Sequence, residues 1–273
     1  MTVGLVQGKV AIVTGSGANI GEACARKLAA EGAKVVVADI NIAGAERVAA
    51  DIRASGGEAM AHPVDLADEA SIVVLIAATV AAYGRIDVLH NNAANTGAAQ
   101  MTRYGALTAM EPEVWDAAFA INTRGTMLMT KHAVPHMIAG GGGSIINTSS
   151  GVSILGDPLN PANSASKAAV NALTRNTATQ FGRANIRCNA VLPGLVLSPV
   201  ARAQMTDAQL AMIQRHVLLP RASVADDIAG GVLWLASDLA AFVTGQIISI
   251  DGGICHHGPH YADMMDMFAA AQG

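Results

Sequence analysis

Residues 10–21, VAIVTGSGANIG, determine which fold this 273-residue chain is expected to adopt. The first four residues are apolar and mostly β-branched, as in a buried strand, and the glycines after them form a turn that leads into a helical pattern. A glycine-rich turn between a strand and a helix lets the backbone approach a pyrophosphate, to which the helix N-terminus offers N–H groups and a positive dipole. Because the spacing is Gly15-x-Gly17-x-x-x-Gly21 instead of GxGxxG, an ordinary helix start is the alternative interpretation.

The next apolar run strengthens the dinucleotide interpretation. It covers residues 34–38 and ends at Asp39, 18 residues after Gly21. A carboxylate at this place can accept both ribose hydroxyls of NAD and repels the 2′-phosphate of NADP. Positions 16, 17, 40 and 41 hold no Arg or Lys that would bind this phosphate. We therefore predict NAD(H) as the cofactor, and a helix N-cap is the alternative role of Asp39.

Strand-like runs alternate with helical patterns further along the chain. Strands are predicted at residues 10–14, 34–38, 86–90, 144–148 and 186–192, and helices at 22–31, 43–55 and 69–83. This alternation implies right-handed crossovers, and the nearly all-apolar strands imply a sheet that is covered on both faces. The sequence therefore predicts an α/β fold with a Rossmann-type doubly wound parallel sheet in three α/β/α layers. We expect a single domain over residues 1–273, with a core at 8–253 and a C-terminal extension at 254–273.

Composition excludes several classes of protein. With 52% hydrophobic residues the chain can bury enough surface to fold, and its net charge of −4 argues against nucleic-acid and membrane-surface partners. Cys24, Cys188 and Cys255 are an odd number and far apart, which favours a reducing compartment. The longest apolar run, residues 72–82 with one threonine, is too short to span a bilayer, and no leader pattern opens the chain. We expect a cytoplasmic protein.

Spaced motifs along most of the chain resemble the classical short-chain dehydrogenase/reductase family. The family's Thr-Gly-x-x-x-Gly-x-Gly matches residues 14–21, with Asn19 in place of the middle glycine, and asparagine tolerates left-handed backbone well. The other matches are Asp65 and Leu66, the Asn-Asn-Ala-Ala at 91–94, Trp115 with Asn122, the Ser-Ser-Gly at 149–151, Lys167, Pro193 and Gly194, Thr244 and Gly245, and the Asp-Gly-Gly at 251–253. They run from about Gly8 to Gly253.

The resemblance implies hydride transfer between NAD(H) and a secondary alcohol or its ketone. It implies that Ser150 holds the substrate oxygen, that Lys167 lowers the pKa of a phenol and contacts the ribose, and that the backbone of Asn122 orders a water molecule. The cofactor-binding residues implied by the resemblance are Gly15, Asn19, Ile20, Gly21, Asp39, Ile40, Asp65, Leu66, Asn92, Lys167, Pro193, Gly194 and Val196. No metal site is expected.

One catalytic position departs from the family pattern. The family has Tyr-x-x-x-Lys, with its serine 13 residues before the tyrosine; counting from Ser150 and Lys167 places Asn163 at the tyrosine. A carboxamide has no proton to transfer in this pH range. Three alternatives follow: the redox reaction survives with another proton donor, the chain is a catalytically impaired NAD-binding homologue, or the tyrosine of an active dehydrogenase was replaced by engineering.

Several segments offer candidate donors or substrate contacts. A water polarised by Lys167, Tyr104 in the loop after the Asn-Asn motif, and a histidine of the C-terminal extension are the candidates for the proton. The extension contains Cys255, His256, His257 and His260, for which metal binding is the weaker alternative, and then an apolar helical pattern of Tyr261, Met264, Met265 and Phe268. We expect this helix to dock on a neighbouring subunit.

The resemblance also bears on the substrate and on assembly. Residues 198–220 have a helical apolar pattern that corresponds to the family's mobile substrate lid, although an ordinary surface helix is the alternative. With Leu195 and Leu197 nearby, this pattern favours an apolar or alicyclic alcohol or ketone as the small-molecule substrate. Because relatives assemble through the helices that carry Asn122 and Lys167, we expect a homotetramer or a homodimer.

Overall fold

The computed structural model describes residues 3–95, 103 and 105–272. The strands are β1 (Val10–Thr14), β2 (Lys34–Asp39), β3 (Glu58–Pro63), β4 (Val88–Asn91), β5 (Gly143–Thr148), β6 (Ile186–Pro193) and β7 (Ile247–Ile250). The helices are α1 (Asn19–Ala30), α2 (Ile42–Ala54), α3 (Glu69–Tyr83), α5 (Pro112–Ala118), α6 (Thr126–Ala139), α7 (Pro161–Phe181), α8 (Pro199–Gln204), α9 (Asp207–Gln214), α10 (Ala225–Ala236) and α11 (Tyr261–Gln272). A π-helical segment, η2 (Phe119–Gly125), joins α5 to α6.

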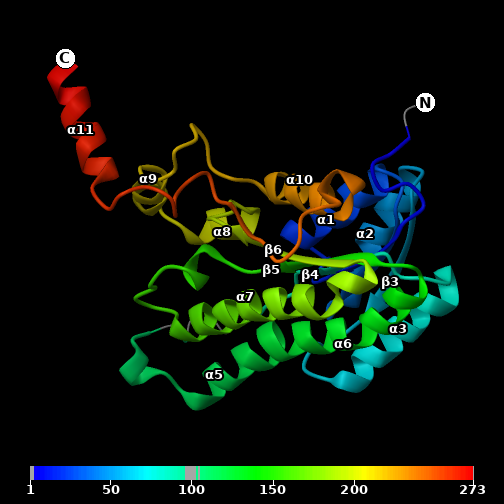
Figure 1. The fold of residues 1–273 in the computed structure, drawn as a ribbon. Coiled ribbons are helices and arrows are strands. Elements are labelled where there is room, and N and C mark those ends of the chain that lie inside the picture. Colours follow the sequence, from blue (N-terminus) through cyan, green and yellow to red (C-terminus); the bar gives the residue numbers. More distant parts are fainter. Residues whose placement is uncertain (1–2, 96–102, 104, 273) are drawn as a thin grey trace.

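Within these residues the strands form one parallel sheet in the order β3-β2-β1-β4-β5-β6-β7. Helices α1, α2 and α10 cover one face of the sheet, and α3, α6 and α7 cover the other (Figure 1). The predicted Rossmann-type doubly wound sheet in three layers is therefore confirmed. The chain reverses its winding direction between β1 and β4, which is the place where such sheets bind their ligands.

The strands are apolar throughout because both of their faces are buried. Successive strand residues point to opposite faces. In β2, Val35 and Val37 belong to the hydrophobic cluster under α1 and α2, whereas Val36 belongs to the cluster under α3 and α6. All three side chains are fully buried. The sheet thus separates two hydrophobic cores.

The structure corrects the predicted elements in two places. Strand β3 was missed because its sequence, EAMAHP, has no β-branched residue, and its partner β2 alone pairs with it at the sheet edge. The helical pattern after position 198 is divided into α8 and α9, since Thr206 begins a new helix by accepting from Gln209 N. The bounds of β1 and α3 are confirmed as predicted, and the other predicted elements differ by up to three residues at an end.

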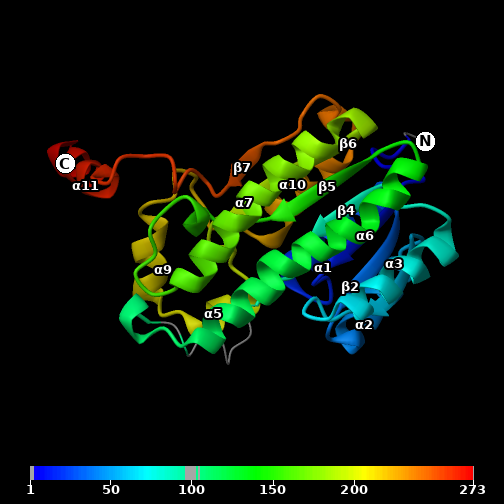
Figure 2. The same ribbon diagram turned by 60° about the horizontal axis from the view of Figure 1, so that its bottom comes forward.

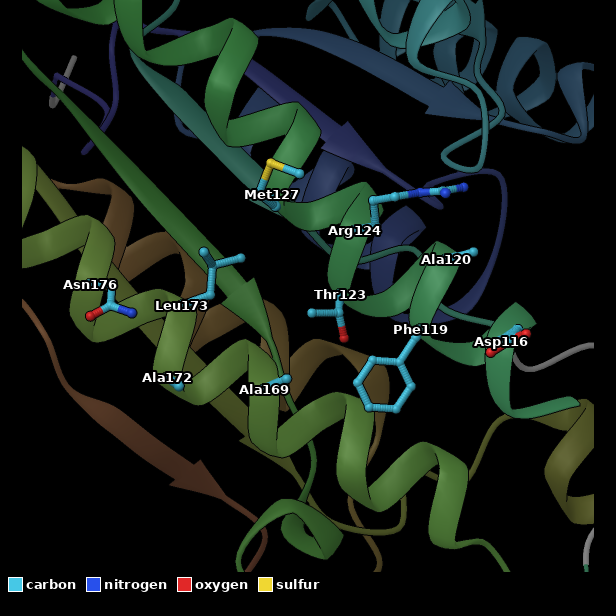
Figure 3. A pocket seen from close by; sticks show the side chains of 10 residues that line it. All are labelled: Asp116, Phe119, Ala120, Thr123, Arg124, Met127, Ala169, Ala172, Leu173 and Asn176. Carbon is cyan, nitrogen blue, oxygen red and sulfur yellow. The ribbon is translucent and has the colours of Figure 1, made fainter. Parts of the chain in front are cut away.

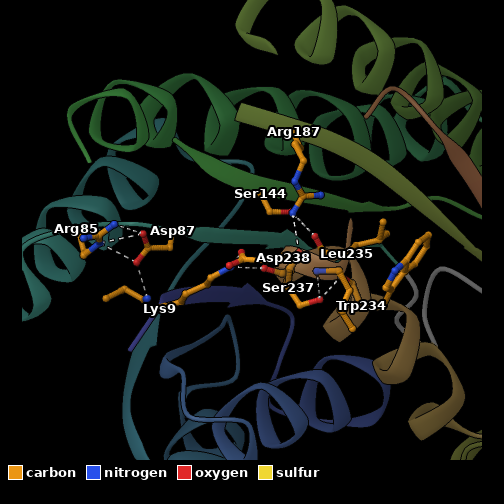
Figure 4. A network of polar contacts seen from close by, with 12 residues as sticks. Lys9, Arg85, Asp87, Ser144, Arg187, Trp234, Leu235, Ser237 and Asp238 are labelled. Atoms are coloured by element: carbon orange, nitrogen blue, oxygen red, sulfur yellow. Dashed lines mark hydrogen bonds and ion pairs between the residues drawn. The ribbon is translucent and has the colours of Figure 1, made fainter. Parts of the chain in front are cut away.

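A polar network lies at the amino-terminal ends of the strands (Figure 4). Asp87, just before β4, accepts from the buried backbone N–H of Val10 at 2.8 Å and pairs with Arg85 at 2.6 Å. On the other side of the network, the guanidinium of Arg187 donates to the carbonyl of Leu235 at 2.6 Å. These contacts hold the amino-terminal ends of the strands together. The cleft described below lies at the opposite, carboxyl-terminal ends.

Helix α11 projects from the body of the molecule in both ribbon views (Figures 1 and 2). Its apolar side chains Met264, Met265, Met267 and Phe268 are about half exposed or more. The predicted helix is present, and its docking on a neighbouring subunit remains a prediction. No helix in the described part of the chain has both the length and the apolar character required to cross a bilayer.

Candidate active site

A cleft of about 670 Å³ opens at the carboxyl-terminal ends of the strands. It passes across the carboxyl ends of the central strands, from the end of β2 to the end of β6. Every predicted catalytic and cofactor-binding residue except Asn122 lines this cleft. The lining residues that were predicted are Gly15, Asn19, Ile20, Gly21, Asp39, Ile40, Asp65, Leu66, Asn92, Ser150, Asn163, Lys167, Pro193, Gly194 and Val196.

The glycine turn between β1 and α1 has no room for side chains at its two ends. A Cβ on Gly15 would lie 2.7 Å from the Cα of Ala93, and a Cβ on Gly21 would lie 2.1 Å from the Gly15 carbonyl oxygen. Asn19 adopts a φ of 52°, the left-handed conformation that asparagine tolerates. The N-cap of α1 is Ala18, and no side chain of the described residues caps this helix end. The first N–H groups of α1 are therefore available to bind an anion.

Asp39 is held in a fixed orientation at the end of β2. Its Oδ2 accepts from Gly17 N at 2.8 Å, and its Oδ1 accepts from Asn41 N at 2.8 Å. The N-cap of α2 is Asn41, whose side chain accepts from Gly44 N, so the alternative N-cap role of Asp39 is wrong. The carboxylate therefore connects the glycine turn to the second strand, and Asp39 lines the cleft.

The other end of the cleft holds the three side chains of the predicted catalytic group that line it. Ser150 follows β5, while Asn163 and Lys167 lie one turn apart near the start of α7. Helix α7 begins here because Asn160 caps it, accepting from Asn163 N at 3.2 Å. The Lys167 ammonium donates to the Thr148 carbonyl at 2.7 Å, and burial lowers the pKa of this group to about 8.

Asn122 lies behind the cleft instead of lining it. Its Oδ1 accepts from Asn95 N at 2.9 Å, and its Nδ2 donates to Ser166 Oγ at 2.9 Å. Its backbone carbonyl, in the π-helical segment η2, accepts from Thr126 Oγ1 at 2.7 Å. Asn122 thus joins the start of α7 to the segment after β4, and the predicted ordering of a water molecule by its backbone stays a prediction.

Sequence reasoning missed a buried histidine beside this group. His90 on β4 is fully buried, and its Nε2 lies 2.9 Å from Thr148 Oγ1. Burial lowers the pKa of His90 to about 3, so this histidine is neutral at physiological pH. In the sequence, the only indication of such a role is that His90 directly precedes the Asn-Asn motif at 91–92. Because the backbone carbonyl of Thr148 accepts from Lys167, the contact of His90 with the Thr148 hydroxyl supports the residue that orients the ammonium.

The C-terminal extension contacts the segment at 198–220, and its Cys255 lies beside Gly151, the residue after Ser150, since a Cβ on Gly151 would be 2.9 Å from Cys255 Sγ. His256 lines a second, largely apolar cavity of about 740 Å³ between α9 and β7. His257 Nε2 lies 2.8 Å from the carbonyl oxygen of His216, and Arg215 pairs with Asp266 of α11 at 2.5 Å. In the described ranges, no three His, Cys, Asp or Glu side chains are arranged to hold a metal ion. Tyr104, the other candidate donor, lies outside the described residues.

A parallel, doubly wound sheet with a glycine turn, an aspartate at the end of the second strand and a serine–lysine pair at one cleft is typical of oxidoreductases that bind a dinucleotide. A family model described as Enoyl-(Acyl carrier protein) reductase matches residues 15–255. The chain is 47% identical over 262 residues to a protein named "Probable short-chain type dehydrogenase/reductase" from Bradyrhizobium diazoefficiens, covering 96% of this chain and 92% of that protein. The chain belongs to the short-chain dehydrogenase/reductase family of oxidoreductases.

Two hydroxysteroid dehydrogenases are also similar to this chain. The 7alpha-hydroxysteroid dehydrogenase of Clostridium sardiniense is 40% identical over 258 residues, with 94% of this chain and 97% of that protein covered. Among solved structures, a 7 alpha-hydroxysteroid dehydrogenase complexed with NADH and 7-oxo glycochenodeoxycholic acid superposes with a TM-score of 0.85. It shares 32% sequence identity, over 91% of this chain and 94% of the other.

Proposed function

We propose that this protein is an NAD(H)-dependent oxidoreductase that interconverts a secondary alcohol and a ketone by hydride transfer. The observation that carries the proposal is the single cleft that joins the Asp39 carboxylate at one end to Ser150 and Lys167 at the other. A bound nicotinamide supplies or accepts the hydride. The polypeptide binds and orients the cofactor and the substrate, and it exchanges a proton with the substrate oxygen.

The residues present fit a dinucleotide. The glycine turn and the N–H groups at the start of α1 would hold the pyrophosphate, and the space above Gly21 would be filled by any side chain there. Asp39 would accept the ribose hydroxyls, and its negative charge opposes a 2′-phosphate, which supports NAD over NADP. Asp65 and Leu66 would contact the adenine. Asn92 and Lys167 would contact the second ribose, and Pro193, Gly194 and Val196 the nicotinamide.

The residues proposed to contact the substrate come from the cleft and from the second cavity, between α9 and β7. The Ser150 hydroxyl would donate to the substrate oxygen, and the Lys167 ammonium places a positive charge near it. We propose an apolar or alicyclic substrate, because the cavity between α9 and β7 is lined by Leu195, Ile213 and Val217. The similarity to hydroxysteroid dehydrogenases supports the same substrate class.

A hollow on the outer face of α7 supports assembly into a homotetramer or homodimer (Figure 3). It measures about 710 Å³ and lies between η2, the start of α6 and the middle of α7. The apolar side chains Phe119, Met127 and Leu173 line it, with Arg124 and Asp116 at its sides. A second copy of the chain could bury these side chains. The three cysteines are free thiols, which supports a reducing, cytoplasmic location.

The proposal is tested by calorimetric titration with NADH and NADPH, followed by NADH consumption with a panel of ketones. The panel should include 7-oxo steroids, alicyclic ketones and sugars. We expect NADH to bind more tightly than NADPH and an apolar ketone to be reduced. No heat with either nucleotide would contradict the cofactor assignment. Binding without turnover, in both this chain and Asn163→Tyr, would instead support the catalytically impaired homologue.

A further inference from the structure

Asn163 leaves the proposed reaction without the family's phenol, so another group has to exchange a proton with the substrate oxygen. Among the described residues that line the cleft, only Asp39, Asp65 and Lys167 have titratable side chains. The two carboxylates follow β2 and β3. Adjacent strands lie about 4.8 Å apart, so the end of β2 is about 14 Å from the end of β5. Lys167 alone shares its end of the cleft with Ser150.

The surroundings of Lys167 differ from those of every other lysine. The chain has five lysines, and four of them form ion pairs with carboxylates at the surface. No carboxylate of the described residues pairs with Lys167, and its side chain is only 5% exposed. The one hydrogen bond that it donates within this part of the chain goes to a neutral backbone carbonyl, that of Thr148. A buried ammonium without a counter-charge is a readily released acid, and burial lowers its pKa to about 8.

Helix geometry places Lys167 next to the position where the proton is needed. Asn163 and Lys167 are four residues apart on α7, so their side chains share one helix face. Asn163 has a much shorter side chain than tyrosine and therefore covers less of the path between the ammonium and the cleft. Ser150 lines the same end and would hold the substrate oxygen.

We propose that Lys167 itself exchanges the proton with the substrate oxygen, in the role that a phenol has elsewhere in the family. The inference rests on the proposed hydride-transfer function. In reduction, the carbonyl carbon takes up the hydride from the reduced nicotinamide, the C=O π bond breaks, and the oxygen takes the proton of an Nζ–H bond. The neutral amine then regains a proton from solvent. In oxidation, the neutral amine removes the hydroxyl proton as the hydride leaves the carbon.

The other candidate donors of the chain are placed differently. His256 lines the second cavity, and His257 Nε2 lies 2.8 Å from the His216 carbonyl oxygen. Neither histidine lines the cleft that holds Asn163 and Lys167. Tyr104 lies outside the described residues and is tested directly by a variant. The substitutions Tyr104→Phe and His256→Asn therefore serve as donor controls. We expect Tyr104→Phe to leave kcat/KM within about threefold of the parent, and His256→Asn, which alters the cavity proposed for the substrate, to keep the pH dependence of kcat.

The first test is a pH profile measured in both directions. Reduction needs the ammonium, so kcat/KM for the ketone should be constant at low pH and fall as pH rises through about 8. Oxidation needs the free amine, so kcat/KM for the alcohol should rise up to about 8 and then level off. A kcat/KM that does not change between pH 7 and 9 in either direction would overturn the proposal. Loss of the pH dependence near 8 (the kinetic limb) in Tyr104→Phe would overturn it as well.

The second test does not depend on turnover. NMR of protein labelled with ¹³C at lysine Cε should give five signals, and the one that is missing from Lys167→Met belongs to Lys167. Its titration midpoint should coincide with the kinetic limb. A midpoint above 10 would overturn the proposal.

Two variants separate this inference from the proposed function. Lys167→Arg keeps the charge but does not release a proton, so kcat/KM should fall about 10²–10⁴-fold, the usual contribution of general acid–base catalysis. Asn163→Tyr should raise turnover and move the limb to the pKa of the new phenol. An inactive parent with an active Asn163→Tyr variant would overturn only the role of Lys167. No NADH binding or turnover in either protein would overturn the proposed function itself.

Discussion

Replacing Asp39 by asparagine should shift the nucleotide preference of this protein. Both carboxylate oxygens are already oriented by backbone N–H groups, those of Gly17 and Asn41, each at 2.8 Å. The side chain therefore loses little conformational entropy when a ribose binds. Hydrogen bonds to a charged group contribute about 1.5–3 kcal/mol each, and asparagine keeps the shape but loses the charge and one acceptor. We expect NADH to bind about 10–100-fold more weakly.

The same substitution should improve NADPH binding. Two unit charges about 4 Å apart repel by roughly 1–4 kcal/mol near a protein surface, and salt screens part of this energy. Removing the carboxylate should therefore tighten NADPH binding about tenfold. The ratio of the two affinities should then change by about 10²–10³, or roughly 3–4 kcal/mol.

Calorimetric titration with both nucleotides at low and moderate salt measures this ratio. The NADPH gain should shrink as salt rises, because it is electrostatic. The matched control is Asp68→Asn, which removes a carboxylate that accepts from Ala70 N at the start of α3, outside the cleft. It should change neither affinity. An Asp39→Asn ratio that moves less than tenfold would refute the role of the carboxylate in selecting the nucleotide.

Three further predictions concern the glycine turn, the network at the strand starts and the C-terminal extension. Gly21→Ala would put a Cβ 2.1 Å from a backbone oxygen, so NADH affinity should fall at least about tenfold, whereas Gly230→Ala in α10 meets nothing within 4 Å and should be neutral or slightly stabilising in thermal unfolding. Asp87→Ala leaves the buried Val10 N–H without its acceptor and should lower the free energy of unfolding by about 2–4 kcal/mol, with a smaller loss in Asp87→Asn; equal losses in urea denaturation would contradict this account. Truncation after Gly253 removes the contacts of the extension to Arg215 and His216, beside the cavity proposed for the substrate, and should raise the substrate KM while NADH affinity is kept; unchanged kinetics and unchanged assembly by size-exclusion chromatography would show that the extension has no such role.

Much of the fold could be predicted because local patterns and tertiary structure agree. Both faces of the central strands are buried, so β1 and β2 appear in the sequence as continuous apolar runs. Strand β3 lacks that signal, since its strand conformation comes from pairing with β2 at the sheet edge. The division of the apolar pattern at 198–220 depends on one capping residue, Thr206, and its Thr-x-x-Gln spacing to Gln209 is the local sequence signal for this helix start.

The site could be predicted only as far as spacing determines contact. Residues 163 and 167 are one helical turn apart, so their common face follows from sequence. The hydrogen bond from Asn122 to Ser166 joins residues 44 positions apart, and the contact between His90 and Thr148 joins two strands. Such pairs depend on how the elements pack, and no local pattern encodes them. Asn122 was predicted as a catalytic residue; the structure shows that it does not line the cleft, and the role of its backbone stays a prediction.

Helix α7 belongs to two surfaces at once. Near its start Asn163 and Lys167 line the cleft, while Leu173, less than two turns further on, lines the outer hollow. A rigid helix transmits a rotation at one of these surfaces directly to the other. If a second copy binds at the outer hollow as proposed, mutations that separate the two copies will also displace the Lys167 amine, so a loss of rate in such a variant is no proof that catalysis needs the second copy.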